Sequence, residues 1–178
     1  MGSTGLDTAP RVILVLGGTR SGKSEVAERI AADTTGPVVY LATGTADGSD
    51  LDGRIADHRR RRPSSWSTVE CGAGLAAALR QHPTGTVLVD SLGTWLTAHH
   101  NFEADTDDLL GALAGRRGTT VIVSEEVGLS VHPATELGRL FVDALGSLNQ
   151  SVAAVADDVA LVVAGRTMWL PADEAGPR

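Results

Sequence analysis

Aromatic residues, cysteine and positive charge are scarce in this sequence, and each shortage excludes something. Phe, Trp and Tyr make up 3% of the chain, so Val, Leu, Ile and Ala have to build most of the hydrophobic core. The single cysteine, Cys71, excludes an intramolecular disulfide and is typical of a reducing cytoplasm. A net charge of −7 argues against a protein that coats nucleic acid, although a local basic site is compatible with it.

Long apolar runs are also missing. No run approaches the roughly 20 residues of a transmembrane helix, and residues 1–10 lack the basic and apolar regions of a signal peptide. We therefore expect a cytoplasmic protein without a membrane span. The 178 residues suit one α/β domain over residues 11–171, with a mobile tail at 1–10 and a second tail at 172–178.

The sequence does contain the phosphate-binding pattern G-x-x-x-x-G-K-[ST] at residues 17–24. Its members are Gly17, Gly18, Thr19, Arg20, Ser21, Gly22, Lys23 and Ser24. An apolar strand is expected before it, at 12–16, and a helix from Lys23 to about Asp33 after it. Backbone N–H groups would hold a triphosphate, Lys23 would reach the β- and γ-phosphates, and the Ser24 hydroxyl would ligate Mg²⁺. The alternative is a chance glycine turn between a strand and a helix.

Strand and helix patterns alternate along the rest of the chain. We expect strands at 38–42, 86–90 and 119–124, and helices over 72–81, 92–100, 108–116 and 133–157. Residues 159–164 and 167–170 read as a two-stranded hairpin. The order predicts an α/β P-loop NTPase fold, with a RecA-like, mostly parallel sheet, flanking helices and a C-terminal β-hairpin.

Polar residues follow several of these strands, where open parallel sheets bind their ligands. Ala42, Thr43 and Gly44 form one such tip, which is either a nucleotide contact or an ordinary turn. Asp90 has the form of a Walker B acid that helps to hold Mg²⁺, although it would also serve as a helix cap. Glu125 and Glu126 are candidates to contact a substrate hydroxyl or a metal, or else they face solvent.

A basic stretch lies between the second strand and the next extended segment. On a helix ending at Pro63, Arg54, His58 and Arg62 would share one face. Neighbouring guanidinium groups would keep the histidine neutral and nucleophilic, and would neutralise a phosphate under attack. The alternatives are a solvated helix face and a patch for nucleic acid. His99 and His100 are interpreted as surface histidines, because no further ligands stand at metal-binding spacing.

Three stretches together are more specific than a generic P-loop. They are residues 13–24; Arg54, Ile55, His58, Arg62, Pro63, Trp66, Glu70 and Cys71; and Glu126, Val127, Gly128, Pro133, Arg139, Phe141, Asp143, Asn149, Gln150 and residues 162–165. Over about residues 11–170, the chain resembles the bifunctional adenosylcobinamide kinase / adenosylcobinamide-phosphate guanylyltransferase family of cobalamin biosynthesis.

The resemblance implies two reactions. ATP or GTP phosphorylates adenosylcobinamide, and GMP from GTP is then transferred to that phosphate through a covalent intermediate on His58, with Lys23 assisting. It implies a homotrimer and no nucleic-acid partner. The nucleotide contacts that it implies are the P-loop, Ala42, Thr43, Gly44, Arg59, Arg60, Arg61, Arg62, Glu70 and Asp90, with Mg²⁺ on Ser24 and Asp90.

The chain departs from the family pattern at three places. Four arginines follow His58, where a lysine and a small turn residue are usual. Glu125 stands where asparagine commonly precedes Glu-Val-Gly, and Asp90 stands where glutamate is common. Two alternative functions stay open: a P-loop small-molecule kinase without a covalent step, and a RecA-like NTP-binding module.

Overall fold

The computed structural model describes residues 10–44 and 63–171 of the chain. The expected helix over 54–62, with His58, Arg59, Arg60, Arg61 and Arg62, lies outside the described residues. So do residues 1–9 and 172–178, which hold the two expected tails apart from Pro10.

One seven-stranded sheet runs through the described part of the chain, in the order β3-β2-β4-β5-β1-β6-β7. All neighbouring strands are parallel except the last pair, in which β7 runs antiparallel to β6. The strands are β1 Arg11–Gly17, β2 Val38–Ala42, β3 Ser67–Glu70, β4 Thr86–Asp90, β5 Thr119–Glu125, β6 Asp158–Val163 and β7 Arg166–Leu170. The predicted P-loop fold with its C-terminal hairpin is therefore confirmed.

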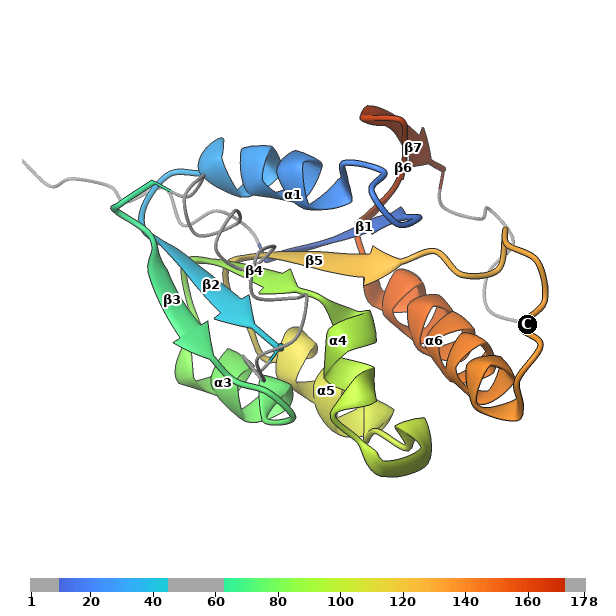
Figure 1. Ribbon diagram of the computed structural model, residues 1–178. Coiled ribbons are helices and arrows are strands. Elements are labelled where there is room, and N and C mark those ends of the chain that lie inside the picture. The colour runs from blue at the N-terminus through green and yellow to red at the C-terminus, as the bar shows by residue number, and fades with distance from the viewer. Residues whose placement is uncertain (1–9, 45–62, 172–178) are drawn as a thin grey trace, which may run out of the picture.

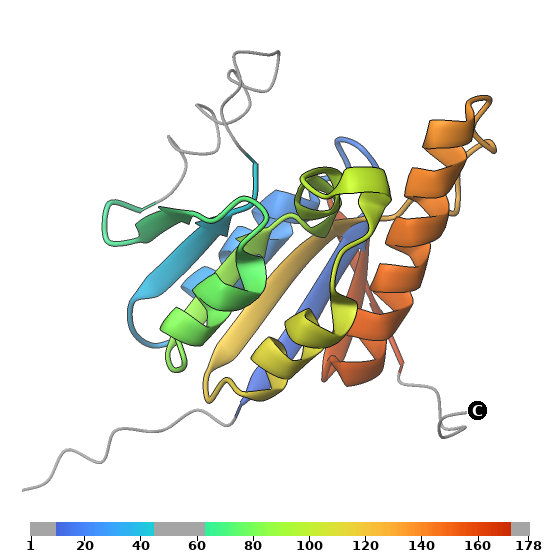
Figure 2. The same ribbon diagram turned by 90° about the horizontal axis from the view of Figure 1, so that it is seen from below.

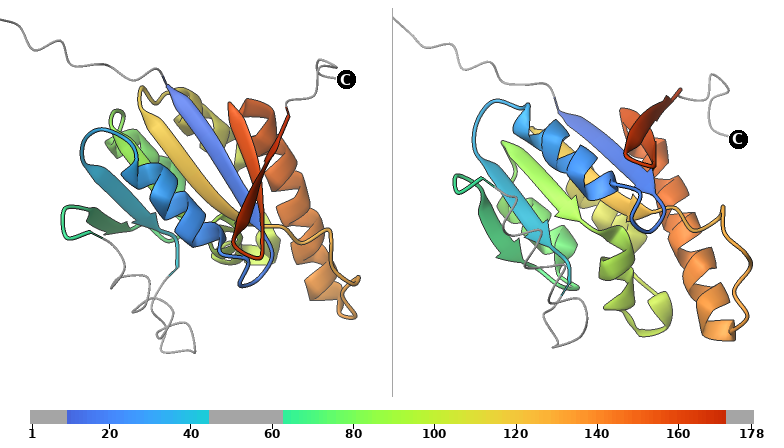
Figure 3. Two further views of the ribbon diagram at one scale, coloured as in Figure 1. Left: turned by 90° about the horizontal axis from the view of Figure 1, so that it is seen from above. Right: turned by 45° about the horizontal axis from the view of Figure 1, so that its top comes forward.

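Helices cover both faces of the sheet. Helix α1 packs on one face, and α3, α4, α5 and α6 lie on the other (Figures 1 and 2; Figure 3, left, shows the α1 face). Their bounds are α1 Lys23–Ala32, α3 Leu75–Gln81, α4 Leu92–Thr97, α5 Thr106–Ala114 and α6 Glu136–Val155, with a short 3-10 helix η1 at His100–Phe102.

The two faces bury two separate hydrophobic clusters. Strand β1 shows how: Leu14 and Leu16 point to the α3–α6 side, whereas Ile13 and Val15 point to the α1 side. Side chains alternate along a strand, so an unbroken apolar run supplies both clusters at once. This burial on both faces is the physical reason for the apolar strands in the sequence.

Several helix ends differ from the prediction, and capping explains two of them. Helix α5 begins at Thr106, two residues early, because the Asp105 carboxylate accepts from the Asp108 N–H at 2.9 Å. Helix α6 begins at Glu136 rather than Pro133, because the Thr135 hydroxyl accepts from the Gly138 N–H at 3.1 Å. Helix α3 begins at Leu75 rather than Gly72.

The predicted helix over 92–100 stops at Thr97. His99 just beyond it is extended, with φ −107° and ψ 139°, and η1 follows and contains Asn101, whose φ is 51°. Over the two described ranges, no helix combines the length and apolarity that a membrane crossing requires.

Candidate active site

The phosphate-binding pattern forms a tight turn between β1 and α1. Gly22, just before the helix, has φ 92°, a left-handed conformation that glycine adopts without strain. A side chain at Gly17 would lie 2.8 Å from the carbonyl of Val162 and would overlap the Ser21 hydroxyl. The N-cap residue, Gly22, has no side chain to cap α1. The Lys23 N–H donates to the Ser21 hydroxyl at 3.3 Å, and the positive end of the helix faces the loop, where an anion would bind.

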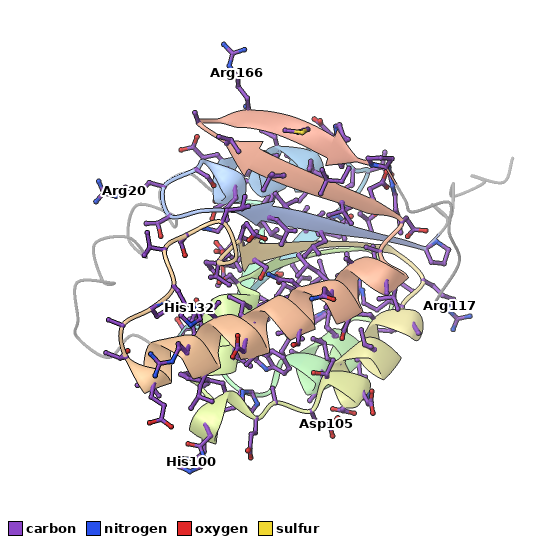
Figure 4. All side chains as sticks on the ribbon, turned by 90° about the vertical axis from the view of Figure 1, so that its right-hand side faces the viewer. Arg20, His100, Asp105, Arg117, His132 and Arg166 are labelled. Carbon is purple, nitrogen blue, oxygen red and sulfur yellow. The ribbon has the colours of Figure 1, made fainter. Side chains whose placement is uncertain are left out.

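The C-terminal hairpin braces this turn. The Gly165 N–H donates to the Ser21 carbonyl at 2.7 Å, and Ala164 and Gly165 both have positive φ, 50° and 75°. The side chains of Arg20 and Arg166 point outward from the loop and the hairpin turn (Figure 4). The hairpin therefore supports the backbone of the phosphate loop.

The Lys23 ammonium lies between the loop and the end of β5. Its Nζ is 3.6 Å from Glu125 Oε1 and donates to the Gly18 carbonyl at 3.5 Å. The two side chains are 12% and 29% exposed. Strand register explains the pairing, because Gly17 at the end of β1 lies beside Glu125 at the end of β5.

The beginning of α4 shapes the space around Glu125. The Ser91 hydroxyl, which caps α4, lies 3.1 and 3.2 Å from the two carboxylate oxygens of Glu125 and donates to them. A side chain at Gly93 would overlap this carboxylate. Sequence reasoning did not single out Ser91 or Gly93, since their roles depend on a register between distant strands.

Asp90 is held at the end of β4 by a neighbour from β2. The Tyr40 hydroxyl donates to Asp90 Oδ2 at 2.7 Å. The alternative that Asp90 caps the next helix is wrong, because Ser91 is the cap. Thr43 is buried, and its hydroxyl donates to the carbonyls of Asp90 and Ser91 at 3.1 and 2.8 Å.

The remaining described candidates are spread along the same edge of the sheet. Ala42 and Gly44 are half-buried beside Thr43, and Glu70 pairs with Ala42 at the end of β3. Strands β2, β4 and β5 separate Glu70 from the phosphate-loop strand. The structure thus brings the loop, Lys23 and Glu125 together and places Asp90 on the next strand.

The cysteine and the two histidines near this edge make structural contacts or face solvent. The Cys71 thiol donates to the Ala42 carbonyl at 3.4 Å, and burial raises the pKa of this thiol, which keeps it protonated. His100 is exposed, and the His99 ring packs edge-on against Trp95 at 4.9 Å. Residues 10–44 and 63–171 contain no group of three or more His, Cys, Asp or Glu that would hold a metal.

Comparisons with known proteins show which family the sequence resembles. Residues 13–170 match the family model described as cobinamide kinase / cobinamide phosphate guanyltransferase. The bifunctional adenosylcobalamin biosynthesis protein CobP of Pseudomonas aeruginosa is 41% identical over 165 residues, covering 88% of this chain and 95% of that protein. The corresponding CobU proteins of Escherichia coli and Salmonella typhimurium are each 33% identical over 175 residues, covering 86% of this chain and 96% of theirs.

A solved structure shows the fold at greater distance. It is described as a prototypical ATPase from the type III secretion system of pathogenic bacteria, with a TM-score of 0.52 and 12% identity. The match covers 86% of this chain, which spans about half, 51%, of the ATPase chain.

Proposed function

The chain belongs to the cobinamide kinase / cobinamide phosphate guanyltransferase family, and we propose that it phosphorylates adenosylcobinamide and then transfers GMP to the product. The first reaction uses ATP or GTP, and the second uses GTP and gives adenosylcobinamide-GDP and pyrophosphate. The observation that carries the proposal is the glycine loop that opens into the uncapped α1, with Lys23 at its end. One such loop serves both reactions, because both require a bound triphosphate.

The guanylyl step is proposed to pass through His58. A neutral imidazole nitrogen attacks the α-phosphorus of GTP, a P–N bond forms, and the bond to the leaving pyrophosphate breaks. An oxygen of adenosylcobinamide phosphate then attacks the same phosphorus, and the P–N bond breaks. The proposal is supported by the position of His58 in the family pattern and by Arg59, Arg60, Arg61 and Arg62, whose charges suit a phosphate under attack.

Mg²⁺ is part of this proposal, with Ser24 and Asp90 as protein ligands. A hydroxyl and a carboxylate are the hard oxygen donors that Mg²⁺ prefers, so the residue types fit the ion. When bound, the ion neutralises charge on the phosphates. The Tyr40 hydroxyl donates to Asp90 Oδ2 at 2.7 Å and so orients the carboxylate at the end of β4. We further propose that Ala42, Gly44 and Glu70 contact the nucleotide, with Thr43 holding the end of β2 in place.

Labelled GTP tests the covalent step. The protein is incubated with GTP carrying ³²P at the α-phosphate, and bound label is measured after denaturation. We expect an acid-labile, base-stable protein–GMP adduct that is absent from the His58→Ala variant. His100→Ala removes an exposed histidine and should retain the adduct.

Other results identify the alternatives. Phosphorylation of adenosylcobinamide without any adduct or GMP transfer would leave a plain P-loop kinase. NTP hydrolysis stimulated by DNA, with neither transfer reaction, would indicate a RecA-like module.

The assembly is proposed to be a cytoplasmic homotrimer. Exposed apolar side chains on α6 and β7 support an assembly, since a monomer would leave them in water. They are Leu137, Leu140, Met168, Trp169 and Leu170. Light scattering coupled to gel filtration tests this, and a molar mass near that of a monomer, 18.4 kDa, would exclude it.

A further inference from the structure

Glu125 occupies a central position at the carboxyl edge of the sheet. It ends β5, which lies between the phosphate-loop strand β1 and the Asp90 strand β4. Its carboxylate is 3.6 Å from the Lys23 ammonium, the group that reaches the β- and γ-phosphates of a bound nucleotide. A carboxylate at this point therefore lies beside the place of the terminal phosphate.

The surroundings of Glu125 hold a carboxylate in one position. Ser91 donates to both oxygens, and Gly93 leaves open the space that the carboxylate fills. At 29% exposed, the side chain is still reachable from the site. The residue is thus both oriented and accessible, two properties that a general base requires.

The two reactions make different demands on such a base. The kinase step uses an alcohol as nucleophile, and its proton has to leave as the new bond forms. The GMP transfer uses a phosphate oxygen that is already ionised, and a neutral histidine. Only the kinase step therefore needs a proton acceptor.

We propose that Glu125 is the general base of the kinase step, an inference that rests on the proposed function. The carboxylate accepts the proton of the substrate hydroxyl. The hydroxyl oxygen forms a bond to the γ-phosphorus, and the bond from that phosphorus to the β–γ bridging oxygen breaks. The products are the phosphate ester, the nucleoside diphosphate and a protonated Glu125, which returns its proton to solvent.

The contacts also distinguish Glu125 from its neighbour. Glu126 Oε1 accepts from the Gly128 N–H at 2.6 Å, so this carboxylate stabilises its own turn. An amide at position 125, as the family resemblance leads one to expect, would accept from Ser91 equally well but would not take up a proton at neutral pH. The proposed role is therefore a property of this chain's carboxylate.

The experiment separates the two half-reactions in one variant. Glu125→Gln keeps the size of the side chain and an acceptor for Ser91, and Glu126→Gln keeps an acceptor for Gly128. Phosphorylation is measured with adenosylcobinamide and ATP. GMP transfer is measured separately with adenosylcobinamide phosphate and GTP. Both variants are also titrated with GTP.

Glu125→Gln should lower kcat of the kinase step by roughly 100-fold to 1,000-fold, the usual contribution of a general base, and should remove the acid limb of its pH profile. GMP transfer should change by less than about threefold, and Glu126→Gln should leave the kinase kcat within about threefold, as expected where no proton transfer is lost.

Three results would overturn the inference. They are an unchanged kinase kcat in Glu125→Gln, equal losses in both half-reactions, and a selective kinase loss in Glu126→Gln instead. Glu125 would then be only a counter-ion for Lys23 in the first two cases. Failure of the unmutated protein in either half-reaction would contradict the proposed function rather than the role of Glu125.

Discussion

The two ends of the parallel sheet hold their charged residues in opposite ways. At the carboxyl end, Lys23 faces Glu125 across 3.6 Å, and both side chains are reachable by water. At the amino end, Arg116 is 3% exposed and donates at 2.8 Å to the Thr120 hydroxyl and to the Gly85 carbonyl. Burial lowers the pKa of this guanidinium to about 10, so it stays charged at neutral pH.

The difference indicates separate roles for Arg116 and Lys23. Arg116 ties the beginnings of β4 and β5 to the end of α5 through the Thr120 hydroxyl and the carbonyls of Gly85 and Thr119. The long contact of Lys23 with Glu125 is weak, as partly exposed ion pairs are. The Lys23 ammonium can therefore exchange its contact with Glu125 for one with a phosphate. Changes at the carboxyl end should alter catalysis, and changes at the amino end should alter stability.

Lys23→Ala should have the largest effect. Both transfer reactions should lose at least about 1,000-fold in kcat/KM, because the charge that stabilises the phosphates is gone. The free energy of unfolding should change by less than about 1 kcal/mol, since the ion pair contributes little. Steady-state kinetics and urea denaturation measure the two quantities. A large loss of stability with little loss of activity would reverse the comparison.

Arg116→Ala should show the opposite pattern. The free energy of unfolding should fall by about 2 kcal/mol, because the Thr120 hydroxyl and the carbonyls of Gly85 and Thr119 lose the Arg116 guanidinium as their donor. The kcat of the protein that remains folded should stay within about twofold, since the residue is remote from the chemistry. Urea denaturation and kinetics below the transition test this. Arg117→Ala is the matched control, because Arg117 is the exposed neighbour and points into solvent (Figure 4).

Gly93→Ala should lower the activity of the carboxyl edge by less than Lys23→Ala does. The added methyl group overlaps the Glu125 carboxylate, so we expect about a tenfold lower kinase kcat, or about 1.4 kcal/mol of activation free energy. At the exposed helical Gly111 nothing meets an added methyl group, and Gly111→Ala should be neutral or stabilising by up to about 1 kcal/mol. An equal kinase kcat in the two variants would show that the open space at Gly93 is unimportant for the kinase step.

The pH dependence of the Cys71 thiol tests whether a residue at the carboxyl edge is also buried. This thiol lies at the carboxyl edge, yet burial raises its pKa above the ordinary 9.0, so the folded protein binds this proton more tightly than the unfolded chain. Any stability from the buried thiol is present below pH 9.0 and declines above it, as the unfolded thiol ionises first. Alkylation by iodoacetamide should reach half its limiting rate above pH 9.0 in the folded protein and near pH 9.0 in urea. The same midpoint in the folded protein and in urea would show that burial does not protect the Cys71 thiol.

Local patterns were sufficient for the fold and for the phosphate loop. The apolar runs at 12–16 and 86–90 reveal strands, and the glycine spacing of 17–24 defines the turn within consecutive residues. Tertiary contacts were not accessible in this way. The approach of Glu125 to Lys23 depends on the register between β1 and β5, and the bond from Tyr40 to Asp90 depends on β2 lying beside β4.

Helix ends show the same limit on a smaller scale. The expected helix over 92–100 ends at Thr97, and the backbone of His99 is extended, a conformation that no apolar spacing encodes. Asp105 and Thr135 are recognisable capping residues, and their identities would have corrected the two helix starts.

The contact between Gly165 and Ser21 has a consequence for synthesis on the ribosome. The phosphate loop emerges early, whereas the hairpin turn that braces it is translated close to the end of the described fold. A nascent chain released before β6 would carry every residue of the nucleotide-binding pattern and still lack the brace. A bound nucleotide should therefore protect the complete chain from proteolysis more than it protects a chain that ends before β6.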